Sequence, residues 1–403
     1  MATRQAIVSG GGIGGLAAAL AMSRAGWAVQ LFEQADSFSE VGAGIQLGPN
    51  VIKVLHGWGL AKALNSVAAF PENLHVRSAV TGEQLGHLRL GKTIAGRYGA
   101  PYVTIHRADL HALLLDALDQ TDADLQLDCA VQGFADYPDG VTVQTAHGGE
   151  FEAELLIAAD GLWSTVRQQL LADGLPRATG HLAYRALVPQ GTLPERLRTQ
   201  NVTVWLGPHM HVVHYPVRRG ELLNIVAFVN GDISVDEIAT WDHNANAADL
   251  DEALQGTPAA LRDLIRAVQY WRLWPMRDRP PISGPEQQAQ GRIALLGDAA
   301  HPMRPYLAQG AGMAIEDAAE LGQLLQKVST QNTFPLLDVP QALQQFAEHR
   351  WRRNARVQTR AIRNGEIFHA DGAVRLARDM AMKLLGEKLL DMPWLYGGAV
   401  KMV

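Results

Sequence analysis

The segment AIVSGGGIGG, residues 6–15, decides the fold class of this chain. Its first four residues form a short apolar run, which is typical of a buried parallel strand. The run leads directly into Gly10, Gly12 and Gly15, which occupy the fixed positions of a G-x-G-x-x-G motif. We therefore expect a strand that turns tightly into a helix.

The residues after this segment complete a strand–helix–strand unit. Helix formers fill residues 16–24, Gly26 stands where a helix would end, and an apolar run, residues 28–32, leads to Glu33. In a dinucleotide-binding unit the first glycine permits the turn, the second lets backbone approach the pyrophosphate, and the third lets the helix pack on the strand. The helix start offers N–H groups to the phosphates, and Glu33 is placed to accept from ribose hydroxyls. The unit indicates a dinucleotide without saying which one.

The composition is that of a folded globular protein. The chain has 403 residues, 47% apolar and 19% charged, which predicts two or three domain-sized units. The net charge of −6 gives no reason to expect nucleic acid as a partner, and no apolar run is long enough to predict a membrane span. Cys129 is the only cysteine, which excludes an intramolecular disulfide and a thiolate zinc cluster. Since we see no signal peptide, we expect a cytoplasmic protein.

A second segment with a possible ligand contact lies far along the chain, in GRIALLGDAAHP, residues 291–302. Its apolar run, residues 293–296, predicts a strand, and a helical pattern follows over residues 310–328. Asp298 could accept from ribityl hydroxyls, and the helix start could aim N–H groups at a flavin ring or a phosphate. Taken alone, an ordinary strand-to-helix turn is an equally good interpretation.

Three signatures together resemble those of the single-component flavoprotein aromatic hydroxylases. They are the glycine motif with Glu33, the Asp160-Gly161 pair in ADGLWS, and GDAAHP at residues 297–302. The resemblance extends over essentially the whole chain. It implies FAD bound in an extended form, with its adenine end at the glycine loop and its flavin end near Asp298 and Pro302. It also implies NADH or NADPH as a transient co-substrate, with Asp160-Gly161 serving both cofactors.

The resemblance assigns cofactor contacts along much of the chain. Two interpretations of Arg167 stay open: it helps to bind the nicotinamide cofactor, or it is an ordinary surface arginine. His301 should turn away from the flavin and brace its loop, while loop N–H groups at residues 306–312 stabilise negative charge on reduced flavin. We expect no metal. The expected cofactor-binding residues are Gly10, Gly12, Ile13, Gly14, Gly15, Glu33, Gln34, Arg107, Val131, Asp160, Asp298, Pro302, Gly310, Ala311 and Gly312.

The scattered signatures predict an α/β fold in three parts. The first part is a Rossmann-like FAD-binding domain that is discontinuous in sequence, and the second is a β-sheet substrate domain that covers the flavin ring. The third is a region of C-terminal helices, where apolar residues recur with helical spacing from Val339 onward. The predicted ranges are 1–75, 100–175 and 272–335 for the FAD domain, 76–99 and 176–271 for the substrate domain, and 336–403 for the helices.

Alternating and apolar runs predict the strands of the substrate domain. They cover residues 202–206, 211–217 and 222–229, and the last two should form an antiparallel hairpin with Gly220 in its turn.

The strand at residues 211–217 carries our candidate for the catalytic base. Hydroxylating an aromatic ring requires it to be electron-rich, usually by removal of a phenol proton, and histidine suits this near neutral pH. Strand alternation puts His209, His211 and Val213 on one face. The segment resembles that of 3-hydroxybenzoate 6-hydroxylases, in which His211 matches a histidine facing the phenol and Tyr215 matches a tyrosine that helps hold the substrate. The alternatives are a strand histidine with no catalytic role and, less favoured, a metal site from His209 and His211.

Two positions depart from these relatives. Pro305 stands where the 3-hydroxybenzoate 6-hydroxylases carry glutamine. The salicylate-type and hydroxynicotinate-type relatives resemble this chain in having proline there. The expected helper of His211 is therefore missing. Gln46 stands where the 6-hydroxynicotinate 3-monooxygenases carry histidine. The C-terminal stretch, residues 368–396, also resembles the gentisate-forming hydroxylases, and we expect its residues to serve packing rather than chemistry.

The expected reaction is hydroxylation of a monocyclic aromatic acid with FAD, NADH and O2, with 3-hydroxybenzoate converted to gentisate as the first choice. The alternatives are a salicylate 1-monooxygenase or a 6-hydroxynicotinate 3-monooxygenase. From other classes, a flavin reductase or oxidase without hydroxylation and a non-catalytic FAD-binding regulator stay open. The expected partners are the aromatic acid, O2 and NAD(P)H, and a homodimer is an expectation from the family.

Overall fold

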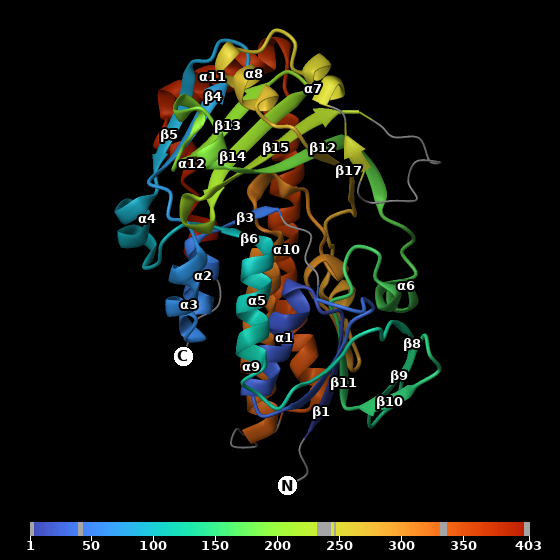
Figure 1. The fold of residues 1–403 in the computed structure, drawn as a ribbon. Coiled ribbons are helices and arrows are strands. Elements are labelled where there is room, and N and C mark those ends of the chain that lie inside the picture. The colour runs from blue at the N-terminus through green and yellow to red at the C-terminus, as the bar shows by residue number, and fades with distance from the viewer. Residues whose placement is uncertain (1–3, 39–42, 232–242, 246, 331–336, 399–403) are drawn as a thin grey trace.

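Two large sheets occupy opposite ends of the molecule, with helices between and around them (Figure 1). The structure, a computed structural model, describes residues 4–38, 43–231, 243–245, 247–330 and 337–398. The mixture of helices and strands confirms the expected α/β class.

The lower sheet in Figure 1 holds the strands of the N-terminal motif. Within the described residues its order is β18-β19-β11-β1-β2-β7, and all neighbours pair in parallel except β18 and β19. The predicted strand–helix–strand unit is confirmed as β1, α1 and β2. The bounds are β1 Gln5–Ser9, α1 Ile13–Arg24, β2 Ala28–Phe32, β7 Asp124–Gln126, β11 Leu155–Ala158, β18 Ala289–Gln290 and β19 Ile293–Leu295.

Helix α1 is buried along most of its length, because it packs against α5 (Arg107–Leu118) and α9 (Gly310–Thr330). Its alanines combine high helix propensity with little bulk, which lets the helices approach closely. At Gly322 of α9, an added Cβ would lie 2.9 Å from the Cβ of Ala21. The chain leaves α1 through Gly26 with φ +85°, as the sequence predicted.

The upper sheet provides the second face of the cavity described below. Its order within the described residues is β16-β17-β12-β15-β14-β13-β4-β5, with β13 and β4 the parallel pair in an otherwise antiparallel set. Strand β17 reaches Asp278 within this sheet, beyond residue 272, where the predicted FAD-domain range resumes. The domain boundaries themselves stay predictions. The bounds are β4 Asn73–Ser78, β5 Gln84–Arg89, β12 Arg177–Pro189, β13 Val202–Gly207, β14 Met210–Val217, β15 Leu222–Asn230, β16 His243–Ala245 and β17 Trp271–Asp278.

The predicted hairpin of the upper sheet is confirmed. Strands β14 and β15 pair antiparallel, and the turn at Arg218–Gly220 has positive φ at all three residues. The two faces of β14 differ as alternation predicted. Met210 and Val212 point into the core under the outer helices, whereas Val213 and Tyr215 face the lower half of the molecule and line the cavity.

Smaller sheets and the remaining helices complete the fold. The long helix α10 begins at a capping box in which Asp338 and Gln341 satisfy each other's backbone N–H groups, and it packs against α9. The smaller sheets contain β3 Gly44–Leu47 with β6 Val103–His106, and β8 Val131–Asp136 with β9 Val141–Thr145 and β10 Glu150–Ala153. The helices are α2 Pro49–Gly57, α3 Ala61–Val67, α4 Gly91–Tyr98, α6 Thr165–Leu171, α7 Ala247–Ala253, α8 Ala259–Arg266, α10 Val339–Phe368, α11 Gly372–Leu385, α12 Glu387–Leu390 and α13 Pro393–Tyr396.

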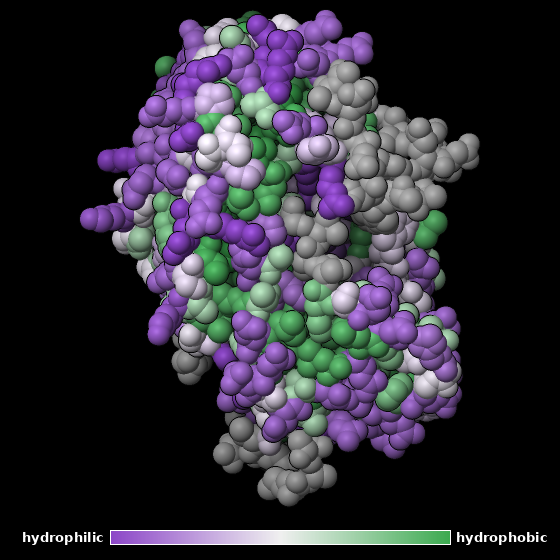
Figure 2. Space-filling view, viewed as in Figure 1, coloured by the Kyte–Doolittle hydropathy of each residue, from purple (hydrophilic) through white to green (hydrophobic). Residues whose placement is uncertain are grey.

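The face of the molecule shown in Figure 2 is hydrophilic over its upper end, and apolar residues gather across its middle. Among the described helices, none is long and apolar enough to cross a membrane.

Candidate active site

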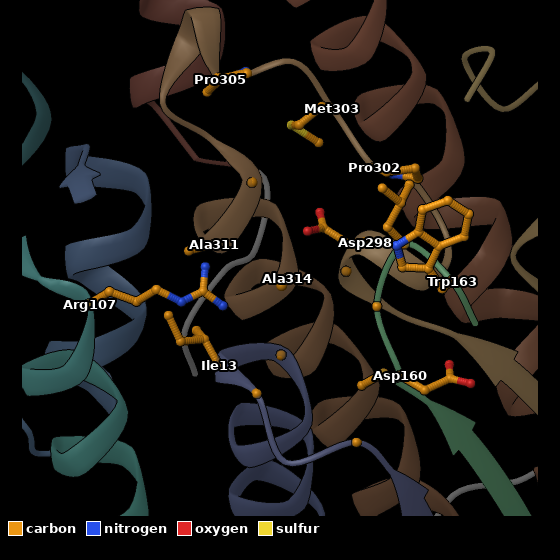
Figure 3. Close-up of a pocket in the computed structure, with 18 of the residues that line it drawn as sticks. Ile13, Arg107, Asp160, Trp163, Asp298, Pro302, Met303, Pro305, Ala311 and Ala314 are labelled. Carbon is orange, nitrogen blue, oxygen red and sulfur yellow. The ribbon is translucent and has the colours of Figure 1, made fainter. Parts of the chain in front are cut away.

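A cavity of about 770 Å³ lies between the glycine loop of the lower sheet and the inner face of the upper sheet. Its volume falls in the range of cofactor and ligand sites in proteins. Residues from both sheets line it, so two parts of the fold must come together to form it. Figure 3 shows part of its lining around the start of α1 and the Asp298 loop.

The glycine loop has the geometry that the motif predicted. Gly10 has φ +101°, and a Cβ there would lie 2.5 Å from the carbonyl oxygen of Ala159. Gly12, the N-cap of α1, faces the cavity with open space where a Cβ would be. Gly15 lies off the cavity wall, and its Cβ would overlap the carbonyl oxygen of Gly10 at 1.8 Å. The loop is therefore a cradle of bare backbone in front of a helix N-terminus, which suits phosphate groups.

Glu33 sits at the end of β2, where its carboxylate is fixed by backbone. One oxygen accepts from the N–H of Gly11 at 2.6 Å and the other from the N–H of Ala35 at 2.9 Å. Each carboxylate oxygen keeps a further lone pair for a hydroxyl group. Glu33 lines the cavity beside Gln34, and Val131 lies on the same wall.

Arg107 and Asp298 approach the middle of the cavity from opposite sides (Figure 3). Arg107 begins α5, whereas Asp298 lies in a short helical turn after β19. The Asp298 side chain is exposed to the open cavity, and the protein around it raises its pKa by desolvation, while the nearby Arg107 and His301 oppose that rise. Such a carboxyl group favours a ligand that offers hydroxyl donors.

The loop after β11 adds Asp160, which also lines the cavity. One of its carboxylate oxygens accepts a long bond of 3.4 Å from the N–H of Val166, and no described residue donates to the other. Burial raises the pKa of Asp160, and hydrogen bonds from Ser164 and nearby backbone oppose the rise.

The start of α9 forms the wall next to Asp298. Gly310 and Ala311 line the cavity there, as does Pro302 of the preceding loop, and the first N–H groups of a helix have no partner within the helix. Gly312 was expected among the cofactor contacts, but the structure places it away from the cavity. A Cβ at Gly312 would lie 2.8 Å from the side chain of Val51, so this glycine allows α9 to pack on α2.

Buried polar side chains brace the loop that carries Pro302. His301 is fully buried and hydrogen-bonds Asp317 through Nε2, in agreement with its expected bracing role. The interpretation of Arg167 as a surface residue is wrong. It is 2% exposed and donates to the carbonyl oxygens of Ala299 and Ala300, because its helix α6 packs beneath this loop.

The upper sheet closes the other end of the cavity with a largely apolar wall. Val213, Val226 and Phe228 form that wall, together with the tyrosine and arginine described next. Four neighbouring strands of the upper sheet line this end of the cavity, β17, β12, β15 and β14.

Two polar groups stand out on this apolar wall. Tyr215 donates to the carbonyl oxygen of Gly44 at 2.7 Å, and burial raises its pKa. Arg185 lies 4.0 Å from the ring of Trp274, and no described residue accepts from its Nε. Burial lowers the pKa of Arg185 to about 10, so it stays cationic at neutral pH. Arg185 was not found from the sequence, because a single arginine within a long strand gives no signal.

His211, the predicted base, does not line the cavity. It is 2% exposed and lies behind the wall, stacked on Phe228 with ring centroids 4.6 Å apart and edge-on to Tyr306 at 4.9 Å. Its Nδ1 hydrogen-bonds Nε2 of His369 at 2.7 Å. Burial, with His369 and His181 close by, holds the pKa of His211 well below its usual value.

Within the C-terminal stretch, residues 368–396, His369 makes a polar contact, and the expectation that this stretch serves packing stays a prediction. This residue is the direct partner of His211, although 158 positions separate the two in sequence. Pro305 occupies part of the cavity wall and offers no side-chain hydrogen bond.

The combined fold and cavity are those of a flavoprotein aromatic hydroxylase. A family model described as an FAD binding domain matches residues 3–342, and the chain belongs to this family. It is 37% identical to a 3-hydroxybenzoate 6-hydroxylase of Polaromonas naphthalenivorans over 97% of this chain and 95% of that one. It is 36% identical to a 6-hydroxynicotinate 3-monooxygenase of Bordetella bronchiseptica over 87% and 88%.

Solved structures agree with this family. A Klebsiella pneumoniae protein, HpxO, complexed with FAD and uric acid, is 26% identical over 96% and 94% of the two chains with a TM-score of 0.83. A salicylate hydroxylase substrate complex is 27% identical over 99% and 96% with a TM-score of 0.80. The protein is thus an FAD-dependent monooxygenase that hydroxylates aromatic compounds, and its bare glycine cradle and the open Asp298 carboxyl group fit FAD.

The close packing at Gly15 gives a first test. Gly15→Ala should force the β1–α1 turn apart, since the new Cβ would overlap backbone that has no room to move. We expect protein that purifies without FAD or retains under a tenth of it, measured by absorbance after desalting. Gly96→Ala in α4 is the matched control, because a Cβ there meets nothing within 4 Å. A yellow Gly15→Ala variant with full FAD would refute the packing role.

Proposed function

We propose that this enzyme uses NAD(P)H and O2 to hydroxylate a monocyclic aromatic acid, and that 3-hydroxybenzoate, converted to gentisate, is its substrate. The observation that carries the proposal is the sheet end of the cavity, where the apolar side chains of β14 and β15 lie next to the guanidinium group of Arg185 on β12. The similarity to 3-hydroxybenzoate 6-hydroxylases over nearly the full length supports the choice of ring.

Arg185 is suited to the carboxylate of such an acid. Its position against Trp274 fixes the plane of the guanidinium group, and Arg185 lines the cavity. A planar guanidinium binds a carboxylate through two parallel hydrogen bonds. Tyr215, held by Gly44, would position the ring from the side.

We propose that His211 accepts the phenol proton. Because His211 stacks on Phe228 and lies edge-on to Tyr306 without lining the cavity, this role requires the side chain of Phe228 or Tyr306 to move aside when the substrate ring binds. Removing the proton places negative charge in the ring and activates the carbon para to the oxygen. FAD, when reduced by NAD(P)H, supplies the electrophilic oxygen from O2. The apolar wall keeps water from the ring.

A second candidate is a salicylate-type or hydroxynicotinate-type substrate. Pro305 favours it, since relatives of those types share this proline. Gln46 opposes the hydroxynicotinate choice: its side chain lines the cavity and accepts from the Tyr102 hydroxyl at 2.6 Å.

Steady-state turnover with three acids tests the proposal. With FAD-loaded enzyme, we expect 3-hydroxybenzoate to accelerate NADH consumption at least tenfold and to yield one hydroxylated product, identified by mass and retention time. Salicylate and 6-hydroxynicotinate should give less product per NADH. Equal rates of NADH oxidation to peroxide with and without every acid would instead identify an oxidase or reductase. A cytoplasmic homodimer and the preference for NADH over NADPH stay predictions.

A further inference from the structure

A continuous row of hydrogen bonds connects buried His211 to an aspartate on the surface. The Nδ1 of His211 contacts Nε2 of His369 at 2.7 Å, and Nδ1 of His369 contacts Oδ1 of Asn230 at 2.7 Å. The amide nitrogen of Asn230 then contacts Nδ1 of His209 at 3.3 Å, and Nε2 of His209 lies 3.3 Å from Oδ2 of Asp371. The row begins at a side chain that is 2% exposed and ends at one that is 66% exposed.

The aspartate at the outer end fixes the direction of every bond in this row. A carboxylate only accepts, so a neutral His209 must carry its proton on Nε2 and accept at Nδ1. Asn230 consequently turns its NH2 group to His209 and its oxygen to His369.

The same logic continues inward. Because Asn230 accepts from Nδ1 of His369, the Nε2 of that histidine is an acceptor. His211 must then donate from Nδ1, which leaves its own Nε2 with a free lone pair. A lone pair on Nε2 is what a base that takes a phenol proton needs.

We infer that Asp371, a surface residue, is a positioning residue that sets the tautomer of His211 through His209, Asn230 and His369. The inference rests on the proposed role of His211. If the row ran the other way, Nε2 of His211 would carry a proton and could not accept one from a substrate.

The backbone holds the three segments of the row in register. The backbone N–H of His209 donates to the carbonyl oxygen of His369 at 2.9 Å. The backbone N–H of Asn230 donates to the carbonyl oxygen of His209, also at 2.9 Å. His209 has φ +57°, an uncommon conformation for a residue other than glycine. Such a conformation persists where the surroundings enforce it, and it places the ring of His209 between Asn230 and Asp371.

The variant Asp371→Asn tests the inference, because an amide both donates and accepts and so leaves the direction open. In the FAD-loaded protein with ¹⁵N-labelled histidine, the ¹H–¹⁵N spectrum of wild type should show His211 protonated on Nδ1 alone. In Asp371→Asn we expect both tautomers, and a fall of about 2–5-fold in kcat for hydroxylation with KM nearly unchanged, because only the Nδ1-protonated fraction accepts the phenol proton. Asp263→Asn, which alters an exposed carboxylate on α8 paired with Arg196, should change neither.

A double variant separates positioning from packing. Adding Asn230→Asp to Asp371→Asn puts a carboxylate in the middle of the row, where it again accepts from Nδ1 of His369, so the wild-type tautomer and most of kcat should return. Unchanged spectra and unchanged kcat in Asp371→Asn overturn the inference. If His211→Gln abolishes hydroxylation in the same series, the proposed function survives that result. If His211→Gln hydroxylates normally, the role of His211 itself fails.

Discussion

Replacing His211 with glutamine should lower kcat for hydroxylation by about 10²–10⁴-fold while FAD stays bound. Glutamine fills much of the same space on β14 but accepts no proton at neutral pH. The substrate phenol would then stay neutral and its ring less reactive. Reduction of FAD by NADH should continue, so the lost turnover should appear as peroxide. The measurement is product formed per NADH consumed, by chromatography and absorbance.

The same strand provides a matched control at His214. This residue is also buried, burial lowers its pKa to about 4, and it accepts from the indole N–H of Trp205. It points to the opposite face of β14, away from the cavity. His214→Gln should therefore lose stability but keep the ratio of product to NADH. Equal loss of hydroxylation in both variants would mean that the strand, and not His211 as a base, is responsible.

The sequence predicted those parts of the site whose chemistry is local. The turn from β1 to α1 needs positive φ at Gly10 and room at Gly15, and no other residue type meets both demands, so the glycine pattern is visible before folding. Alternation along β14 separated His211 from His214 in the same way. Each of these predictions depends on neighbours within a few residues.

Contacts between distant segments left no comparable signal. His369 reaches His211 across 158 residues, and Arg167 turns inward only because α6 packs under the Pro302 loop. Arg185 meets Trp274 across two strands of the upper sheet. The sequence names the residue types but not these pairings, since they are decided by how the two sheets meet. Gly312 packs α9 on α2, a contact that the sequence did not show either, and its role at the cofactor stays a prediction.

The buried ion cluster that joins α9 to α10 shows what holds the cofactor loop in place. Arg350, 1% exposed, donates to Asp317 at 2.6 Å and to Glu316 at 2.9 Å. Asp317 in turn binds His301 of the loop, and Gln358 of α10 donates to the carbonyl oxygen of Pro302 at 3.0 Å. Loss of Arg350 would leave Asp317 buried without its guanidinium partner and Glu316 with Arg353 alone, which costs far more than losing an exposed pair.

Arg350→Leu should therefore lower the free energy of unfolding by about 3–5 kcal/mol at pH 7, measured by urea denaturation of the FAD-loaded protein. Arg352→Leu on the same helix is the control, because Arg352 is exposed and its loss should cost less than about 0.5 kcal/mol. FAD retention should fall in Arg350→Leu but not in Arg352→Leu, because only the first variant removes a contact that braces the loop after β19.

The pH dependence of that loss tells whether charge is its cause. Burial alone would raise the pKa of Asp317, but His301 and Arg350 outweigh it and hold the pKa at about 2. A carboxyl group with a folded-state pKa below its unfolded value stabilises the fold above the unfolded pKa, near 4, and loses that contribution as pH falls toward 2. The variant lacks one of the two groups that lower this pKa, so the difference in free energy of unfolding between wild type and Arg350→Leu should shrink as pH falls from about 4 toward 2. A difference that stays constant across that interval would show that Arg350 acts through packing of its side chain rather than through its charge.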